Sequence, residues 1–360
     1  MAKKIKVALV GVGNCSSFLV QSVEYYRGRE EKDIPGIMHV ALGGYRVEDI
    51  EFVAAFDVDK RKVGKDLSKA ILQEPNNAVK LADVPKAGVT VEKGPVLDGV
   101  GDYLKKVVLI DPNQKPVNVV DILKSSKAQV VINYLPVGSY DATRYYAQET
   151  LSAKCGFINA IPEFLASGDF ANKFEEKKLP ILGDDIKGQL GASVLSRTLA
   201  RLFKDRGTAL DRMYQLNFGG NTDFLNLLEE SRLKYKRISK TETVQSVLEE
   251  KRLEEENIKI GPSDYVPWLG TRKIASMRFE GRSFGDISVY LDVKLDVDDK
   301  SVSAGIMVDA VRCCRLAMDR KIGGALVSSS AYFFKVPPIQ YPDYVAKQML
   351  EEFIEGKRER

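Results

Sequence analysis

The densest group of candidate catalytic side chains lies between residues 183 and 240. A Gly-Asp-Asp-Ile-Lys-Gly-Gln turn at 183–189 is followed by a Gly-Gly-Asn-Thr-Asp-Phe-Leu-Asn turn at 219–226. Lys236 and Lys240 come next, and a spacing of four places both on one face of a helix. Paired acids and clustered lysines on such turns suit an anionic, hydroxyl-rich substrate. A solvated helix face is the alternative for the lysine pair.

The first of these turns has the composition of a phosphate site. Gly188 and Gln189 are expected to begin a helix directly after Asp185 and Lys187. Free backbone N–H groups at a helix start, next to a cation, bind phosphate. Ordinary capping of a crossover helix is the alternative, and on this motif alone it is the simpler one. Asp223 likewise is either a site acid or a helix N-cap.

Two single lysines stand beside apolar neighbours. Lys273 precedes Ile-Ala, and Lys335 follows Tyr-Phe-Phe. A lysine near apolar groups can have a lowered pKa and act as an acid or base, but a single lysine more often extends its ammonium to solvent. The chain has one histidine, His39. This excludes a metal site with several histidine ligands and leaves acid–base work mainly to Lys, Asp, Glu or Tyr.

A glycine-rich loop follows a strand predicted at 4–10 and opens a helix predicted at 15–26. It matches the dinucleotide fingerprint G-x-G-x-x-G with Ser16 in the third place. Its glycines let a pyrophosphate approach the helix N-terminus. Asp57 ends a second strand predicted at 51–56 and would bind the adenosine ribose, which favours NAD over NADP. An insertion at 27–49 separates it from the loop by more than the usual ~20 residues. A structural strand–helix turn is the alternative.

Asn-Tyr-Leu-Pro-Val-Gly at 133–138 follows a Val-rich strand predicted at 129–134. Open parallel sheets bind ligands at the carboxyl ends of their strands. We therefore expect this segment to contact the nicotinamide-ribose side of a cofactor, with a plain turn as the alternative.

The composition is that of an ordinary globular protein of 360 residues, 44% hydrophobic and 29% charged. The net charge of +4 is spread along the chain without a basic stripe, so no nucleic-acid partner is expected. No run of 18 apolar residues is present, so no membrane span is expected, and residues 1–13 are interpreted as a first strand rather than a signal peptide. The four cysteines lack CxxC spacing and fit a reducing cytosol, which predicts a cytoplasmic protein.

Strands and helices alternate over the first 204 residues. The alternation predicts an α/β fold, a doubly wound parallel sheet of the Rossmann type covered on both faces. Further helices are predicted at 61–72, 117–124, 140–152, 171–178 and 189–204, and further strands at 156–160 and 180–183. The segment 75–116 is expected to be irregular, with a strand-like piece at 107–110.

After residue 207 the pattern becomes that of a second, α+β domain. A strand is predicted at 213–218 and a charged helix at 241–253. Residues 284–297 alternate apolar and polar side chains, which is typical of an antiparallel strand with one wet face. A helix at 304–319 and a tail at 341–355 are expected to return to the first domain. The expected units are 1–205 for NAD binding, 206–303 for catalysis and tetramerisation, and 304–360 for the return.

Taken together, these segments resemble inositol-1-phosphate synthase, the NAD-dependent family that cyclises glucose 6-phosphate, in its compact prokaryotic, actinobacterial-like form. The similarity runs over nearly the whole chain. It covers residues 10–17, 54–59, 134–138, 183–187, 217–226, 238–240, 301–310 and 331–335.

With the motifs above, the resemblance implies a set of site residues. Catalytic groups are implied at Asp185, Asp223, Lys236, Lys240, Lys273, Asp299 and Lys335. Cofactor contacts are implied at Gly11, Gly13, Asn14, Cys15, Ser16, Asp57, Tyr134, Leu135, Pro136 and Asp184. Phosphate contacts are implied at Lys187, Gly188, Gln189 and Lys240. The chain departs from the family at 270–273, which lacks the usual acid of an Asp-Ser-Lys turn, and at Gly188, where relatives often carry a phosphate-binding Ser.

The resemblance also implies a redox-neutral reaction of glucose 6-phosphate: oxidation at C5, loss of a proton from C6, attack of C6 on the C1 aldehyde, and reduction at C5. Each step puts charge on an oxygen, so fixed ammonium groups are the expected stabilisers. Lys236 is the candidate for the C5 oxygen, and Lys273 and Lys335 for developing alkoxides, with the aspartates orienting them. The family forms homotetramers through the second-domain sheet. A cation, if one is used, is expected on phosphate, carboxylate and water oxygens.

Two other functions remain open at this point. An NAD-dependent sugar-phosphate dehydrogenase would need only one acid–base residue. A non-catalytic NAD-sensing module would account for the glycine loop but not for the second cluster. The number of placed lysines favours the cyclising enzyme over both.

Overall fold

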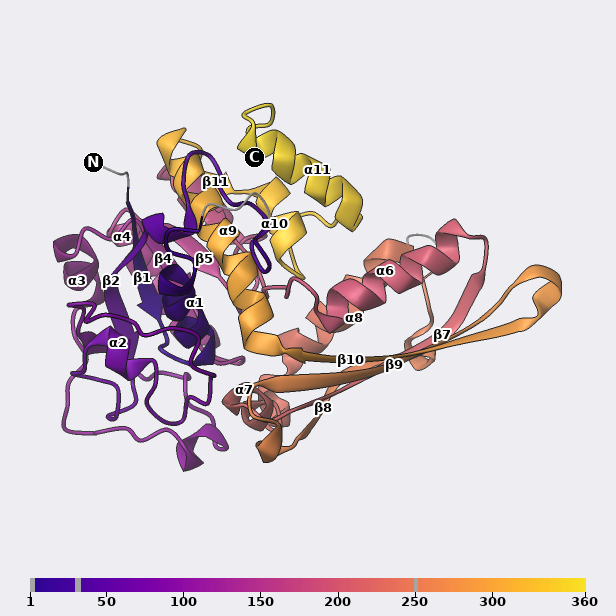
Figure 1. Cartoon of the computed structure of the whole chain (residues 1–360), viewed down its shortest axis with the longest axis horizontal. Helices are drawn as coiled ribbons and strands as arrows, with labels where there is room; N and C mark the ends of the chain where they lie inside the picture. The colour runs from indigo at the N-terminus through magenta and orange to yellow at the C-terminus, as the bar shows by residue number, and fades with distance from the viewer. Residues whose placement is uncertain (1–3, 30–33, 249–251) are drawn as a thin grey trace.

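The computed structural model describes residues 4–29, 34–248 and 252–360. In this part the chain forms a rounded body, which also holds the C-terminus, and an elongated arm of long strands and helices (Figure 1). Each part is built on its own sheet.

The body contains a seven-stranded parallel sheet in the order β11-β6-β5-β4-β1-β2-β3. The strands are β1 (Ile5–Val10), β2 (Ile50–Asp57), β3 (Val91–Lys93), β4 (Val130–Asn133), β5 (Gly156–Asn159), β6 (Pro180–Leu182) and β11 (Gly324–Ala325). The register places Val10 level with Phe56 on one side and Asn133 on the other. The loops after β1, β2 and β4 therefore leave the sheet at one edge. The strand order reverses at β1, which is where doubly wound sheets open a crevice.

Alternate side chains of β1 enter two different cores. Ile5, Val7 and Leu9 pack in a cluster shared with α1 (Asn14–Tyr25), α9 (Asp299–Asp319), α10 (Val327–Phe333) and α11 (Asp343–Ile354). Ala8 and Val10 pack in a cluster shared with α3 (Val119–Ser125), α4 (Tyr140–Ser152) and α5 (Asp169–Glu176). The sheet is thus covered on both faces, as the sequence predicts. None of the helices in the described ranges is long and apolar enough to cross a bilayer.

The arm contains a four-stranded sheet in the order β10-β9-β7-β8. The strands are β7 (Ala209–Gly219), β8 (Ile258–Tyr265), β9 (Arg272–Arg282) and β10 (Ser288–Asp298). β7 and β8 are parallel, and the other pairs are antiparallel. α6 (Ala192–Asp205) and α8 (Lys234–Leu248) share one core cluster with this sheet, and the short α7 (Thr222–Asn226) follows β7. Because α6 packs here, it lies with the second sheet although the expected first unit extends to residue 205.

Several elements differ from the sequence prediction. The helix expected at 61–72 is reduced to α2 (Leu67–Ala70), because Gly64 takes a φ of +82° and Asp66 then caps a new start. The strand of the irregular segment is β3, not 107–110. The helix predicted at 241–253 is α8, which begins seven residues earlier and is described as far as Leu248. Strands β8 and β9 were not predicted, although residues 275–280 of β9 alternate apolar and polar side chains as β10 does.

The last third of the chain links the two sheets. α9 begins directly after β10 in the arm, passes along α1 and reaches the body (Figure 1). β11 then extends the first sheet beside β6. Residue 299 therefore lies at the junction of arm and body. Short 3-10 turns complete the fold at Val47–Asp49, Leu104–Lys106, Glu230–Arg232, Glu255–Asn257, Pro267–Leu269 and Phe284–Asp286.

Candidate active site

One large cavity lies where the carboxyl edge of the first sheet meets the arm. It is lined from the body by the loops after β1, β2 and β4, and from the arm by α7, β9 and the start of α6 and α9. The predicted site residues that line it are Gly11, Gly13, Asn14, Cys15, Asp57, Tyr134, Leu135, Pro136, Asp185, Gly188, Asp223, Lys273, Asp299 and Lys335. Residues more than 300 positions apart, such as Gly11 and Lys335, thus share one cavity.

The glycine loop has the shape of a phosphate cradle. Gly11 has a φ of +90°, and a Cβ there would lie 2.9 Å from the carbonyl oxygen of Tyr134. A Cβ at Gly13 would meet no atom within 4 Å, so this side of the loop faces open space. Ser16 does not line the cavity; its Oγ donates to the carbonyl of Gly11 over 2.6 Å and closes the turn. These features fit a pyrophosphate at the start of α1.

Asp57 is hydrogen-bonded to this loop despite the long insertion between them. Its Oδ2 accepts from the backbone N of Val12 over 2.8 Å, and its Oδ1 accepts from the backbone N of Val58 and Asp59 over 2.7 and 2.9 Å. The Nζ of Lys62 lies 3.8 Å from Oδ2. The carboxylate is therefore fixed at the position where a ribose diol binds in such folds.

An apolar slot extends the cavity beyond Asp57. The side chains that line it come from β2, α4 and the segment expected to be irregular: Phe56, Pro95, Val96, Leu104, Val108 and Tyr146. Asn14 anchors a neighbouring segment, since its Oδ1 accepts from the backbone N of Asn77 and Ala78 over 2.8 and 3.0 Å. An apolar slot next to a ribose acid fits an adenine ring. No periodic pattern in the sequence predicts this slot.

The cavity is also lined by two half-buried neutral groups, Cys15 and Tyr134. Burial raises the pKa of the Cys15 thiol and raises that of the Tyr134 hydroxyl well above its usual range. Both groups therefore keep their protons at neutral pH. The Tyr134 hydroxyl has no hydrogen-bond partner within the described residues, so a polar ligand group would satisfy it.

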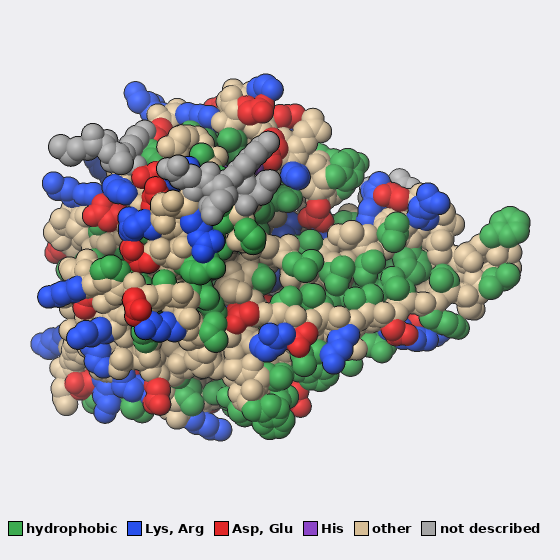
Figure 2. Space-filling model, in the orientation of Figure 1, with side chains coloured by type: hydrophobic (Ala, Val, Ile, Leu, Met, Phe, Trp, Pro, Cys, Tyr) green, Lys and Arg blue, Asp and Glu red, His purple; other side chains and the backbone are tan. Residues whose placement is uncertain are grey.

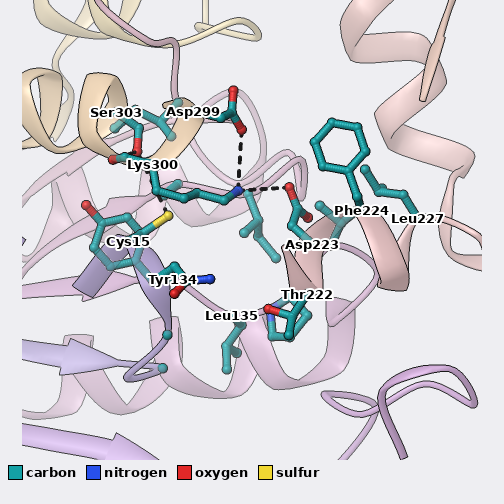
Figure 3. A pocket seen from close by; sticks show the side chains of 18 of the residues that line it. Cys15, Tyr134, Leu135, Thr222, Asp223, Phe224, Leu227, Asp299, Lys300 and Ser303 are labelled. Atoms are coloured by element: carbon teal, nitrogen blue, oxygen red, sulfur yellow. Dashed lines mark hydrogen bonds and ion pairs between the residues drawn. The ribbon is translucent and has the colours of Figure 1, made fainter. Parts of the chain in front are cut away.

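Alternating charges from β9, α7 and the start of α9 line the cavity, and Figure 3 shows the part formed by Asp299, Lys300 and Asp223. Lys273 Nζ lies 2.9 Å from Asp299 Oδ1, Lys300 Nζ lies 3.4 Å from Asp299 Oδ2, and Lys300 Nζ lies 3.1 Å from Asp223 Oδ2. Burial alone would raise the pKa of Asp299, but Lys273 and Lys300 outweigh it and hold that pKa far below its usual range. Asp299 is thus a carboxylate at neutral pH, and it holds Lys273 Nζ in place over 2.9 Å.

A second pair, Asp185 and Lys335, faces the same cavity. Lys335 Nζ lies 3.0 Å from Asp185 Oδ1, and the Lys335 backbone N donates to the Asp185 carbonyl over 2.8 Å. The backbone of Val336 also pairs with that of Asp184 in both directions. This antiparallel contact brings together residues 150 positions apart and aims Asp185, at a φ of +60°, into the cavity.

Two residues predicted to contact the ligands, Asp184 and Lys187, bind other groups of the protein instead. Asp184 is fully buried and accepts from Asn159 Nδ2 over 2.7 Å and from the backbone N of Ala166 over 3.0 Å. Lys187 is buried beside Asp343, with Nζ 3.2 Å from Oδ1, and burial lowers its pKa to about 8. These contacts turn both side chains away from the cavity.

The phosphate contact expected from Gln189 is also displaced. Its backbone N donates to the carbonyl of Val302 over 3.1 Å, and its Nε2 donates to the carbonyl of Gly36 over 2.8 Å. The helix begins at Ala192 after Gly191, not at Gln189. The amides of residues 192–194 precede the first intrahelical bond, and these residues line the cavity. The helix-start amides are therefore three residues further along than predicted.

Lys236 and Lys240 both fall on α8. Their side chains lie outside what the structure describes. Lys300, by contrast, is a cavity residue that the sequence analysis missed. The neighbouring Asp298 and Ser301 form the sequence pattern of a helix N-cap. No feature of the local sequence distinguishes Lys300 from a surface lysine. Within the described ranges, no three His, Cys, Asp or Glu side chains are grouped as ligands for a metal ion.

The fold and the cavity define a two-domain α/β protein of the dinucleotide-binding class, with a lysine–aspartate site at the junction of its domains. The myo-inositol-1-phosphate synthase family profile matches residues 191–300. The inositol-3-phosphate synthase of Mycolicibacterium smegmatis is 52% identical over 360 residues, covering 99% of each chain. The chain belongs to the myo-inositol-1-phosphate synthase family.

Solved structures agree with this assignment. The crystal structure of Ari2 matches with a TM-score of 0.79 at 34% identity, over 98% of this chain and 99% of that one. The inositol-3-phosphate synthase of Caenorhabditis elegans matches with a TM-score of 0.76 over 98% of this chain and 86% of its own. At 14% identity, this second match bears on the fold alone.

Proposed function

We propose that the chain is an inositol-3-phosphate synthase that converts D-glucose 6-phosphate into 1L-myo-inositol 1-phosphate in an NAD-dependent, redox-neutral cyclisation. The observation that carries the proposal is the single cavity that joins a dinucleotide loop to lysines held in place by carboxylates. The family membership at 52% identity over the whole chain supports it.

NAD fits the cavity. The cradle at Gly11 and Gly13, the fixed carboxylate of Asp57 and the apolar slot follow one another in the order phosphate, ribose and adenine. Bound NAD would accept a hydride from C5 and later return it. Asp57 favours NAD over NADP, since a 2′-phosphate would meet its negative charge.

The residues of the chain would act on the charge that develops on substrate oxygens. Lys273 and Lys335 offer ammonium groups that Asp299 and Asp185 hold in place. Positive groups fixed before the reaction stabilise an alkoxide or enolate without reorganisation. They would therefore favour loss of the C6 proton and attack of C6 on the C1 aldehyde.

The substrate phosphate would bind the start of α6. Residues 192–194 present the amides that precede the first helical bond, and the positive end of the helix dipole favours an anion. Gly188 lines the same part of the cavity. Lys236 and Lys240 on α8 remain the proposed contacts of the C5 oxygen and the phosphate.

A homotetramer assembled through the arm is part of the proposal. Apolar side chains gather along the arm, and others stand at its tip (Figure 2). Along the arm they are the half-buried Leu195, Leu199, Val289, Leu291, Val293 and Leu295, and at the tip the exposed Phe284 and Ile287. A face of this kind favours a protein partner. Light scattering after gel filtration would check the assembly.

The cysteine usage also supports a cytoplasmic location.

The assay that tests the function uses glucose 6-phosphate with a catalytic amount of NAD+. We expect substrate consumption over many turnovers without lasting absorbance at 340 nm, and a non-reducing cyclic phosphate as product. A sugar-phosphate dehydrogenase would instead accumulate NADH one-for-one with substrate. A non-catalytic NAD-binding module would consume nothing. Either of these outcomes would overturn the proposal.

A further inference from the structure

Lys300 lies between two site carboxylates at the junction of arm and body. It is the second residue of α9, and its side chain is 10% exposed. Its Nζ is 3.1 Å from Asp223 Oδ2 and 3.4 Å from Asp299 Oδ2 (Figure 3). Asp223 comes from α7 in the arm, so the ammonium joins two elements 77 positions apart in sequence.

The surroundings keep Lys300 charged. Burial opposes the ammonium form, but the acidic groups around it, Asp223 foremost and Asp299 with it, together outweigh burial and raise the pKa of Lys300 above its usual range. The neighbouring Cys15 stays a thiol, because burial raises its pKa as well. The group between the two carboxylates is therefore a permanent cation at neutral pH.

Loss of this cation would leave carboxylate oxygens facing one another across the cavity. Oδ1 of Asp299 keeps Lys273, but Oδ2 of Asp299 and Oδ2 of Asp223 both point at the position of the Lys300 ammonium. Carboxylate oxygens are the ligands that Mg²⁺ and similar hard cations prefer. A small cation from solution could enter the space that a truncated side chain leaves, because Lys300 lines the cavity.

We propose that Lys300 is a positioning residue that serves as the built-in cation of this site. Its ammonium holds the carboxylates of Asp223 and Asp299 at fixed positions beside the cavity. It thereby makes turnover independent of added monovalent or divalent cations. The inference rests on the proposed function, because Asp299 in turn positions Lys273.

The test compares wild type with Lys300→Met and with Lys294→Met as a matched control on the exposed face of β10. All are stripped of metals and assayed in a tetramethylammonium buffer. Wild type and Lys294→Met are expected to turn over equally with or without NH₄⁺, K⁺ or Mg²⁺. Lys300→Met is expected to lose at least tenfold in kcat and to regain at least threefold on addition of one of these cations. A purely structural lysine would not give a cation-dependent recovery.

A second readout does not depend on activity. Paramagnetic resonance of Mn²⁺ is expected to show one more bound ion per chain in Lys300→Met than in wild type. Wild-type turnover in Lys300→Met without added cation would overturn the inference, as would a loss that no cation restores. If Lys300→Met does not fold, Lys300→Gln takes its place. If neither variant folds, the wild-type measurement decides. Turnover that is independent of added cations supports the inference, and a requirement for them overturns it.

Failure of the inference is distinct from failure of the proposed function. A wild-type enzyme that makes no cyclic phosphate in the presence of NAD⁺ and every cation tested rejects the function. A wild-type enzyme that makes it, combined with a fully active or unrescued Lys300→Met, rejects only the role of Lys300.

Discussion

The backbone N of Val12 donates to Oδ2 of Asp57 over 2.8 Å, so the phosphate loop and the ribose acid form one hydrogen-bonded unit. The same carboxylate accepts from two further backbone N–H groups at the end of β2. Asp57 therefore fixes the shape of the loop, and under the proposed function it also presents a negative charge to the ribose. Substitutions can separate these two roles.

Asp57→Asn keeps an acceptor for Val12 but removes the charge, whereas Asp57→Ala removes both. We expect Asp57→Asn to narrow the preference for NAD⁺ over NADP⁺, because the 2′-phosphate no longer meets a carboxylate. Asp57→Ala should in addition weaken binding of both cofactors. Fluorescence titration of each variant with each cofactor measures the two effects. Unchanged affinities in both variants would remove Asp57 from the cofactor site.

Lys335 and Lys273 should each be needed for turnover. We expect Lys335→Ala or Lys273→Ala to lose about a hundredfold in kcat, which is the scale of removing one oxyanion donor. The charge-matched control is Lys294→Ala on the exposed face of β10, which should leave kcat and the melting temperature unchanged. Steady-state cyclisation rates decide the point. Wild-type rates in both cavity variants would contradict the assignment.

The sequence predicted those parts of the site that depend on local pattern. The glycine loop and Asp57 could be located because strand, turn and acid follow one another in a fixed order. Asp184 and Asp185 could not be told apart, because their orientation depends on the contact of that backbone with residues 335 and 336. Asp185 takes a φ of +60° and reaches the cavity, while Asp184 turns into the body.

Long-range contacts account for the other differences. Lys300 gains its role from Asp223, 77 positions away, and no local pattern marks such a pair. Gln189 was expected to begin a helix, but Gly191 is extended and delays the start to residue 192. Of the second sheet, strands were predicted at 213–218 and 284–297, which correspond to β7 and β10. Residues 275–280 of β9 alternate as well and could have supported a third strand, whereas β8 depends on its pairing with β7.

Arg197 should be among the most sensitive positions for stability. Its fully buried guanidinium lies 2.8 Å from Asp343 Oδ2 and donates to the carbonyls of Thr243 and Tyr341 over 2.7 and 2.8 Å. It thereby joins α6, α8 and the C-terminal segment. Arg197→Met should destabilise the protein by about 3–5 kcal/mol, the cost of breaking a buried ion pair from one side. Arg201→Met, which breaks a more exposed pair on the same helix, should cost about 0.3–0.5 kcal/mol. Equal melting temperatures for the two variants would contradict this.

His39 should make stability depend on pH. Its Nδ1 lies 2.5 Å from Asp309 Oδ2, and its Nε2 lies 3.2 Å from Glu351 Oε1. Burial alone would lower the pKa of His39, but the two carboxylates outweigh it and raise that pKa above 6.5. Asp309 also pairs with Arg312, and Tyr332 lies close to both acids.

The sign of the effect follows from the raised pKa. The folded chain binds the His39 proton more tightly than the unfolded chain, so its contribution to stability is fully present below about pH 6.5 and is lost as pH rises through the folded-state pKa. We expect the melting temperature of wild type to fall over that interval by more than that of His39→Gln. Because the chain has one histidine, a single imidazole resonance in a proton–carbon NMR titration reports the same pKa directly. A midpoint at or below 6.5 would contradict the prediction, whatever the melting curves show.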